Sequence, residues 1–249
     1  MTERFWLEGT ISVEAALQGA SREVYGLYYR VTEKKRQQRR LQRLQNMAEA
    51  AGVPVHQVDD AFLTTKAEGN SHGGVLAEVS ARSFLTLADL IPQDRPGFVV
   101  MLDGIEDPFN FGQAVRALYA AGVDGIVLRP RNWMQATAVV ARASAGATER
   151  VAMAVVEEAA AAATFFRQRG YRIAATSEKG AQTIYDADLT TSLFLLLGGE
   201  KRGITRSFLK KADVLLRVPY GRPFPYALGT AMSAAVIGFE LLRQRAAAG

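Results

Sequence analysis

Three loops hold the residues whose types and spacing could perform chemistry. The first, DGIEDPFNFG, begins at Asp103, and Arg116 follows its Asn110 by six residues. The second, GGEKRG, spans 198–203, and the third, VPYGRPFPYALG, spans 218–229. Together they offer a fixed cation, carboxylates, an amide and glycines that let the backbone approach a ligand closely. Such a set could hold and orient a substrate that is itself already activated.

The position of these loops in the chain says more about function than any one loop does, because each alone could be an ordinary connection between a strand and a helix. Each follows an apolar run of strand length: 98–102, 193–197 and a short strand around Leu215. Continuous apolar strands between helices are typical of a parallel sheet covered on both faces. Ligands of such sheets bind at the carboxyl ends of the strands, so we expect the loops to gather at one edge.

The hydrophobic pattern places further elements around these loops. It predicts strands over 125–128 and 171–175, and helices over 110–121, 135–145 and 157–169. A stretch with two prolines interrupts the pattern before the first of the apolar strands. We therefore predict a small α/β domain over 1–84, a linker over 85–96 and a larger α/β domain over 97–249.

The small domain is predicted to contain a long helix and several short elements. The pattern indicates a helix over 12–17 opened by a serine cap, strands over 24–31, 53–58 and 74–79, and a helix over 33–51. Apolar residues at helical spacing should form the inner face of the long helix: Leu41, Leu44, Ala48 and Ala51.

A separate stripe of arginines follows the same long helix at spacings i, i+3, i+4 and i+7: Arg36, Arg39, Arg40 and Arg43. One interpretation is a solvated helix face. The other is a contact with a nucleic-acid backbone. The all-arginine composition favours the second, because guanidinium is the better partner for phosphate.

Composition excludes several classes of site. Hydrophobic residues make up 49% of the chain and charged residues 22%, with a net charge of +5, as in ordinary globular proteins. Without cysteine there is no disulfide, thiolate nucleophile or cysteine-ligated zinc, and two histidines are too few for a histidine cage, so we expect no metal. The N-terminus lacks a signal-peptide core and no 18-residue apolar run occurs, so we expect a cytoplasmic protein without a membrane partner.

Familiar catalytic motifs do not occur in the sequence either. It contains no GxGxxG, no GxxxxGK[ST] and no GxSxG. A site without metal, thiol or histidine relay suits the transfer of an activated group, because positioning can supply most of the rate.

At these motifs the sequence resembles the SpoU (TrmH-type) RNA ribose 2'-O-methyltransferases. Asn110-Phe111-Gly112 with Arg116 is similar to the first family motif, and LLLGGEKRGI to the second. ADVLLRVPYG and the last helix, YALGTAMSAAVIGFELLRQR, are similar to the third, and VVARASAGATERVAMAV to the family's RaSaGA segment. The match spans about residues 97–245. More loosely, EGTISVEAAL and HGGVLAEV resemble the family's L30e-like substrate-binding domain.

The resemblance implies an α/β protein of the SPOUT fold: a parallel sheet with helices on both faces, its C-terminal segment threaded into a trefoil knot, beside an L30e-like domain. It also implies S-adenosylmethionine as cofactor, RNA as substrate and a homodimer. We predict an RNA 2'-O-ribose methyltransferase, with ribosomal RNA favoured because an added domain suits a structured substrate. The alternatives are a transfer RNA 2'-O-methyltransferase and a non-catalytic RNA-binding or ribosome-assembly protein that keeps the knotted fold.

The resemblance assigns roles to residues at matching positions. The catalytic candidates are Asn110, Arg116 and Glu200. Because arginine is almost never neutral in proteins, we expect Arg116 to hold the target phosphate and stabilise the developing alkoxide rather than act as a base. We expect Asn110 to cap its helix as well. The cofactor-binding candidates are Leu197, Gly198, Gly199, Gly203, Val218, Tyr220, Leu228 and Thr230. Charge and placement, rather than matching motifs, give the RNA-binding candidates: Arg36, Arg39, Arg40, Arg43, His72 and Arg142.

The third motif departs from the family pattern, which usually reads SLNVS. The aligned residues here are Ala227, Leu228, Gly229, Thr230 and Ala231, of which only the leucine is kept. Thr230 and Ser233 are the candidates to replace the missing polar side chains.

Overall fold

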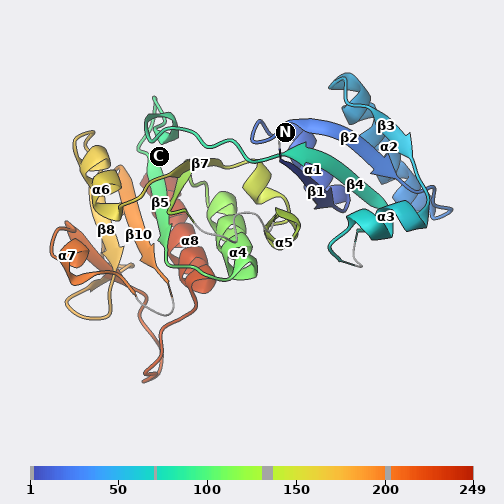
Figure 1. Ribbon diagram of the computed structural model, residues 1–249. Helices are drawn as coiled ribbons and strands as arrows, with labels where there is room; N and C mark the ends of the chain where they lie inside the picture. Colours follow the sequence, from blue (N-terminus) through green and yellow to red (C-terminus); the bar gives the residue numbers. More distant parts are fainter. Residues whose placement is uncertain (1–2, 70–71, 131–136, 200–202, 249) are drawn as a thin grey trace. The chain divides into compact units, whose positions relative to one another are not determined.

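The chain divides into two compact units in the computed structural model, which describes residues 3–69, 72–130, 137–199 and 203–248 (Figure 1). The first unit contains Met1–Ser83 and Gln135–Arg150, and the second contains Phe84–Met134 and Val151–Gly249. The first unit thus includes a segment, 135–150, that the sequence analysis assigned to the larger domain.

The first unit is built on a four-stranded sheet in the order β1-β4-β2-β3. β4 pairs antiparallel with β1 and β2, and β3 pairs parallel with β2. The strands are β1 (Arg4–Glu8), β2 (Val24–Tyr29), β3 (Val55–Gln57) and β4 (Val75–Ser80), and the helices are α1 (Thr10–Gln18), α2 (Lys35–Ala50) and α3 (Asp60–Lys66). Neither β1 nor α3 was predicted, since each is short and mixes polar with apolar residues.

Two details of these helices differ from the prediction. The serine cap is wrong: α1 begins at Thr10 after Gly9, whose φ of 81° turns the chain out of β1, and Ser12 is buried within the helix. Leu41, Leu44 and Ala48 do face the core, but Ala51 is exposed because it lies beyond the last turn of α2.

The segment 137–150 packs into the core of this unit. Its elements are α5 (Thr137–Ala143) and a short 3-10 helix, Ala147–Glu149. Ala141 joins the apolar cluster formed by Leu7, Val13 and Leu27. Gly146 has a φ of 79°, and a Cβ added there would lie 2.5 Å from Cβ of Ala15, so the tight turn and the close packing both require glycine.

The second unit contains a seven-stranded sheet in the order β7-β6-β5-β10-β8-β11-β9, and every pairing in it is parallel. This confirms the predicted parallel sheet. The strands are β5 (Phe98–Asp103), β6 (Gly125–Leu128), β7 (Ala152–Val155), β8 (Arg172–Thr176), β9 (Gln182–Thr183), β10 (Leu193–Gly198) and β11 (Val214–Arg217). The predicted strands are present, and the sheet gains β7 and the two-residue β9.

Helices cover both faces of this sheet, as predicted. They are α4 (Pro108–Ala120), α6 (Ala159–Arg167), α7 (Arg206–Leu209) and α8 (Thr230–Ala248), with a 3-10 helix at Ala88–Leu90. Figure 1 shows α4 and α8 side by side, and a Cβ on Gly238 of α8 would lie 3.0 Å from Cβ of Ala121. On the other face, Phe166 of α6 and Phe208 of α7 join a cluster with alternate residues of the central strands.

The last turns of α8 are fastened to the starts of two central strands. Arg245 donates hydrogen bonds to the carbonyl oxygens of Pro96 (2.8 Å), Gly97 (3.0 Å) and Thr191 (2.8 Å). The helix is therefore held along β5 and β10, and its first turn lies at the carboxyl ends of these strands. Within the described ranges no helix is both long and apolar enough to cross a membrane.

Candidate active site

The carboxyl ends of the central strands lie at one edge of the seven-stranded sheet. β10 pairs in parallel with both β5 and β8, and β8 with β11. The loops that follow β5, β10 and β11 therefore leave the sheet at the same edge, as predicted from the sequence.

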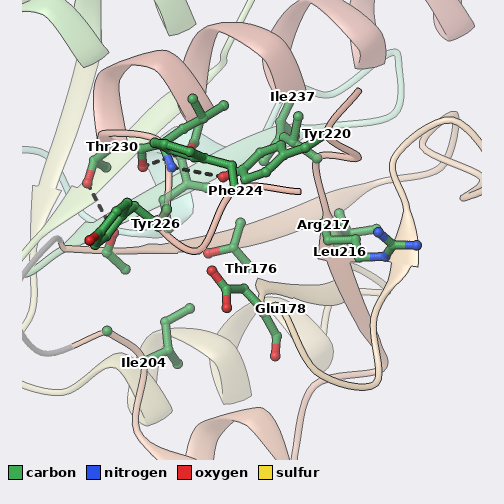
Figure 2. Close-up of a pocket in the computed structure, with 18 of the residues that line it drawn as sticks. Thr176, Glu178, Ile204, Leu216, Arg217, Tyr220, Phe224, Tyr226, Thr230 and Ile237 are labelled. Atoms are coloured by element: carbon green, nitrogen blue, oxygen red, sulfur yellow. Dashed lines mark hydrogen bonds between the residues drawn. The ribbon is translucent and has the colours of Figure 1, made fainter. Parts of the chain in front are cut away.

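A cavity of about 940 Å³ lies at this edge (Figure 2). Its walls come from the segments after β8, β10 and β11 and from the start of α8. All eight residues predicted to bind the cofactor line it: Leu197, Gly198, Gly199, Gly203, Val218, Tyr220, Leu228 and Thr230. The volume is that of a small-molecule site, and its leucine, isoleucine, aromatic and glycine lining suits a ligand with an apolar ring.

Two glycines bring the loops after β5 and β10 into direct backbone contact. A Cβ added to Gly199 would lie 2.1 Å from the carbonyl oxygen of Gly104. Gly104 has a φ of 87°, and Gly203 closes the second loop with a φ of 59° and donates to the carbonyl of Gly199 at 3.2 Å. A side chain on Gly199 would clash with the Gly104 carbonyl, whereas Gly104 and Gly203 favour glycine because of their positive φ angles.

Two hydrogen bonds fix the chain that follows β11 over this cavity. The backbone N–H of Leu228 donates to the Tyr220 hydroxyl at 3.0 Å. The Thr230 hydroxyl donates to the carbonyl of Gly198 at 3.2 Å, which ties the first residue of α8 to the end of β10 (Figure 2). Thr230 stands at the position of the motif's valine, next to the lost asparagine, and supplies a polar contact of its own. The Ser233 hydroxyl lies 3.5 Å from the carbonyl of Leu228.

The start of α4 differs from the prediction in its cap. The helix begins at Pro108, and the Asp107 carboxylate accepts a hydrogen bond from the backbone N–H of Asn110 at 2.8 Å. Aspartate is a strong cap and proline suits the first turn, so the capping role proposed for Asn110 is wrong. Asn110 is half-buried in the first turn of α4.

Of the three catalytic candidates, the structure describes Asn110 and Arg116, and these two do not line the cavity. Arg116 is exposed on α4. Glu200 lies outside the described residues. Next to the first loop, Asp103 at the end of β5 forms an ion pair with Arg129, with an Nε–Oδ1 distance of 3.0 Å.

The RNA-binding candidates all belong to the first unit. The four arginines of the stripe are exposed on α2, and Arg43 pairs with Glu14 at 2.7 Å. His72 is half-buried, and its Nδ1 accepts from the backbone N–H of Gly74 at 3.2 Å. Arg142 forms an ion pair with Glu8, whose side chain is fully buried.

Glu149 is buried in the first unit among two arginines and a serine. Its carboxylate accepts from Arg22 Nε at 3.0 Å and from the Ser21 hydroxyl at 2.9 Å, and Arg82 lies 3.4 Å away. Burial raises the pKa of the Glu149 carboxyl, but the Arg82 and Arg22 guanidiniums and the Ser21 hydrogen bond outweigh burial and hold this pKa below its usual range.

Sequence reasoning missed two groups of cavity residues. Thr176, Ser177 and Glu178 line the cavity from the end of β8, as do Phe224 and Tyr226 from the chain after β11. A signal for the first group existed, because TSE directly follows an apolar strand of the same parallel sheet. For the second, the signal is aromatic residues that each follow a proline in a loop already singled out.

Known families match both parts of the chain. The SpoU rRNA Methylase family matches residues 97–238, and the family described as RNA 2'-O ribose methyltransferase substrate binding matches residues 6–85. The chain is 30% identical to the 23S rRNA (guanosine-2'-O-)-methyltransferase RlmB of Shewanella oneidensis, over 95% of this chain and 96% of that protein. It is also 30% identical to RlmB of Ralstonia nicotianae, over 98% of each.

Solved structures show the same fold. An rRNA methyltransferase from Sinorhizobium meliloti has a TM-score of 0.79 and 23% identity, with 97% of this chain and 88% of that one covered. The SpoU methyltransferase AviRb from Streptomyces viridochromogenes, in complex with the cofactor AdoMet, has a TM-score of 0.79 and 20% identity, with 98% and 91% covered.

The parallel sheet with its glycine-lined cavity, joined to a substrate-binding unit, defines an S-adenosylmethionine-dependent RNA 2'-O-methyltransferase of the SPOUT fold. The family match covers more than half of the chain, and the relatives match it almost from end to end. The chain belongs to the SpoU rRNA Methylase family.

Proposed function

We propose that this protein methylates the 2'-hydroxyl of a guanosine ribose in 23S ribosomal RNA. The observation that carries the proposal is the cavity at the carboxyl edge of the parallel sheet, lined by all eight residues that the family resemblance assigns to the methyl donor. The substrate rests on the relatives, which are 23S rRNA guanosine 2'-O-methyltransferases matched over 95% or more of this chain.

The described residues fit S-adenosylmethionine. At Gly199, which contacts Gly104, backbone atoms without a side chain face the cavity. Leu197, Ile204 and Leu228 add apolar side chains to its lining. Backbone N–H and C=O groups of the loops after β10 and β11 can form hydrogen bonds with the edge of an adenine. The glycines in these loops let the adenine come close to the backbone. When bound, the cofactor supplies a methyl group already activated on a sulfonium.

The roles of the chain's own residues follow from that chemistry. The 2'-oxygen takes on negative charge as its hydroxyl proton departs, and a fixed guanidinium stabilises that developing charge. We assign this role, together with holding the target phosphate, to Arg116. Its exposure on α4 leaves it accessible to RNA. Asn110, half-buried in the first turn of the same helix, is proposed to orient the ribose.

Recognition of RNA is assigned to the first unit, whose segment 6–85 matches the substrate-binding family. The exposed arginines of α2 would contact phosphates, and such contacts position RNA without reading its sequence. Arg142 is held by buried Glu8, and we therefore assign it a supporting role in this unit rather than a leading one in RNA binding.

A homodimer is part of the proposal. α4 and α8 pack beside each other, and large apolar side chains on both remain exposed: Phe109, Tyr119, Met232, Phe239 and Leu242. Apolar surface of this kind is commonly buried between copies of a chain. Sedimentation of the purified protein would measure the oligomeric state, and a monomer at micromolar concentration would count against this part.

Methyl transfer tests the proposal directly. Calorimetry would measure binding of S-adenosylmethionine, and a tritiated-methyl assay would compare unmodified 23S rRNA transcript with bulk transfer RNA. We expect label on the ribosomal transcript at a guanosine 2'-oxygen. Arg116→Ala should lower the transfer rate by about 100-fold or more while donor affinity stays within a few-fold. Donor binding without transfer to any RNA would favour a non-catalytic RNA-binding protein instead.

A further inference from the structure

The loop after β11 contains three aromatic residues that each follow a proline: Pro219-Tyr220, Pro223-Phe224 and Pro225-Tyr226. Their rings lie near one another along one side of the cavity (Figure 2). The centroids of Tyr220 and Phe224 are 6.3 Å apart with an interplanar angle of 58°, and those of Phe224 and Tyr226 are 5.4 Å apart at 70°.

All three rings are exposed although they line the cavity, and Tyr220, at 38%, is the least exposed of them. Phe224 is 57% exposed and Tyr226 is 69% exposed. Tyr220 differs, because its hydroxyl accepts the hydrogen bond from Leu228 that closes the loop. Phe224 and Tyr226 contribute little to the core, and exposed apolar surface beside a ligand cavity is typical of a binding site.

The loop is stiff enough to hold these rings in place. Each proline fixes one backbone angle, and the hydrogen bond between Leu228 and Tyr220 joins the two ends of the segment 220–228. Two residues after Leu228, Thr230 is hydrogen-bonded to Gly198 at the end of β10. A ligand that stacks on the rings therefore meets a surface that is already ordered, which lowers the entropic cost of binding.

The charges of the loop indicate the kind of ligand. Between residues 217 and 230 the only charged side chains are Arg217 and Arg222, and both are exposed. Among the described residues that line the cavity, Glu178 is the carboxylate, and it comes from the end of β8 instead. Exposed aromatic rings combined with arginine, without an acid, are what proteins use to bind unpaired bases and their phosphates.

We propose that Phe224 and Tyr226 form a stacking platform for an unpaired base of the RNA substrate, at or next to the methylated nucleotide. This inference rests on the proposed function. The platform borders the donor cavity, so a base stacked there places its ribose at the mouth of that cavity. Arg222 is positioned in the same loop to contact the adjoining phosphate.

Substitution of the two rings tests the platform. The probes are a fluorescently labelled single-stranded RNA of mixed sequence and unmodified 23S rRNA transcript, each titrated into the full chain. Stacking of one base on aromatic side chains contributes about 1–3 kcal/mol, so removing the platform with Phe224→Ala and Tyr226→Ala together should weaken binding of the single-stranded probe about 10- to 100-fold. The KM for the transcript should rise in the same direction. Tyr226→Phe should retain affinity, because stacking needs the ring and not the hydroxyl.

The salt dependence separates stacking from charge. The double alanine variant should keep the wild-type slope of log affinity against log salt, whereas Arg222→Gln should reduce that slope. Tyr185→Ala is the matched control: Tyr185 is 57% exposed in the same unit and does not line the cavity, so its removal should leave RNA binding unchanged.

Three results would overturn the platform. The double variant could bind RNA as tightly as Tyr185→Ala does. It could lose affinity for S-adenosylmethionine in calorimetry with RNA affinity unchanged, which would assign the rings to the donor. It could instead alter only the oligomeric state in sedimentation, which would assign them to a second copy of the chain. Failure of the wild type to methylate 23S rRNA would refute the proposed function, whereas the single-strand titration would still decide the platform.

Discussion

In the first unit, the buried carboxylates of Glu8 and Glu149 hold arginines, whereas the seven-stranded sheet of the second unit has an apolar interior, and Glu240, a buried carboxylate of that unit, lies on α8. The buried polar residues show the contrast: Glu8, Ser12, Thr137, Ser144, Thr148 and Glu149 belong to the first unit, and Thr230 and Glu240 to the second. The cohesion of the first unit therefore depends on matched charges. That of the second depends on close packing and on glycines where backbones touch.

The largest effect is expected from removing a buried charge in the first unit. Glu149→Gln leaves the guanidiniums of Arg22 and Arg82 without their carboxylate, and breaking a buried pair in this way costs about 3–5 kcal/mol. Urea unfolding would measure the loss. Asp60→Asn is the control, because the Arg30–Asp60 pair is exposed and should contribute less than about 1 kcal/mol. Equal losses in both variants would contradict the stabilising role given to the buried charges of the first unit.

In the second unit, adding one methyl group should be the damaging change. Gly199→Ala would place a Cβ 2.1 Å from the Gly104 carbonyl, so the two loops must separate at a cost of about 1–3 kcal/mol. We expect a loss of S-adenosylmethionine affinity of about tenfold or more in calorimetry. Gly221→Ala is the control. Gly221 lines the same cavity, but a Cβ added there would meet no atom within 4 Å, so this variant should bind the cofactor normally.

Acid should weaken the first unit through the loss of the Glu149 carboxylate. The pKa of Glu149 is lower in the folded protein than its usual value of about 4.5, so its stabilisation is complete above that pH and is lost as the pH falls towards the folded pKa. Hydrogen exchange measured below about pH 4.5 should show the first unit opening more readily, and Glu149→Gln should remove much of this dependence. A loss of protection spread evenly over both units would argue against it.

The smallest expected effect concerns the exposed arginines of α2. Arg39→Gln and Arg40→Gln should leave stability unchanged and weaken RNA binding modestly. Each lost phosphate contact should reduce the slope of log affinity against log salt by about 0.7–0.9. Arg169→Gln removes the same charge from an exposed site in the second unit and serves as the control. Unchanged slopes in the α2 variants would mean that the stripe is only a solvated face.

The candidate site could be predicted only in part. Glycines, strand ends and family motifs identify the cofactor residues because these signals are local in sequence. The cap of α4 was assigned to Asn110 although Asp107 and Pro108 carry the standard cap signal, so that error lay in how the residues were interpreted. Arg142 is different, since nothing near it in sequence indicates that buried Glu8 holds it.

The sequence by itself determined the fold class, the parallel order of strand and helix, and the membership of the family, because periodicity and motifs are properties of neighbouring residues. Only the tertiary structure decided that residues 137–150 pack with the first unit, that Glu149 meets Arg22 across 127 positions, and that β8 and the proline-aromatic loop share one cavity. Burial and charge pairing act through space, and residues far apart in the chain acquire these partners only when it folds.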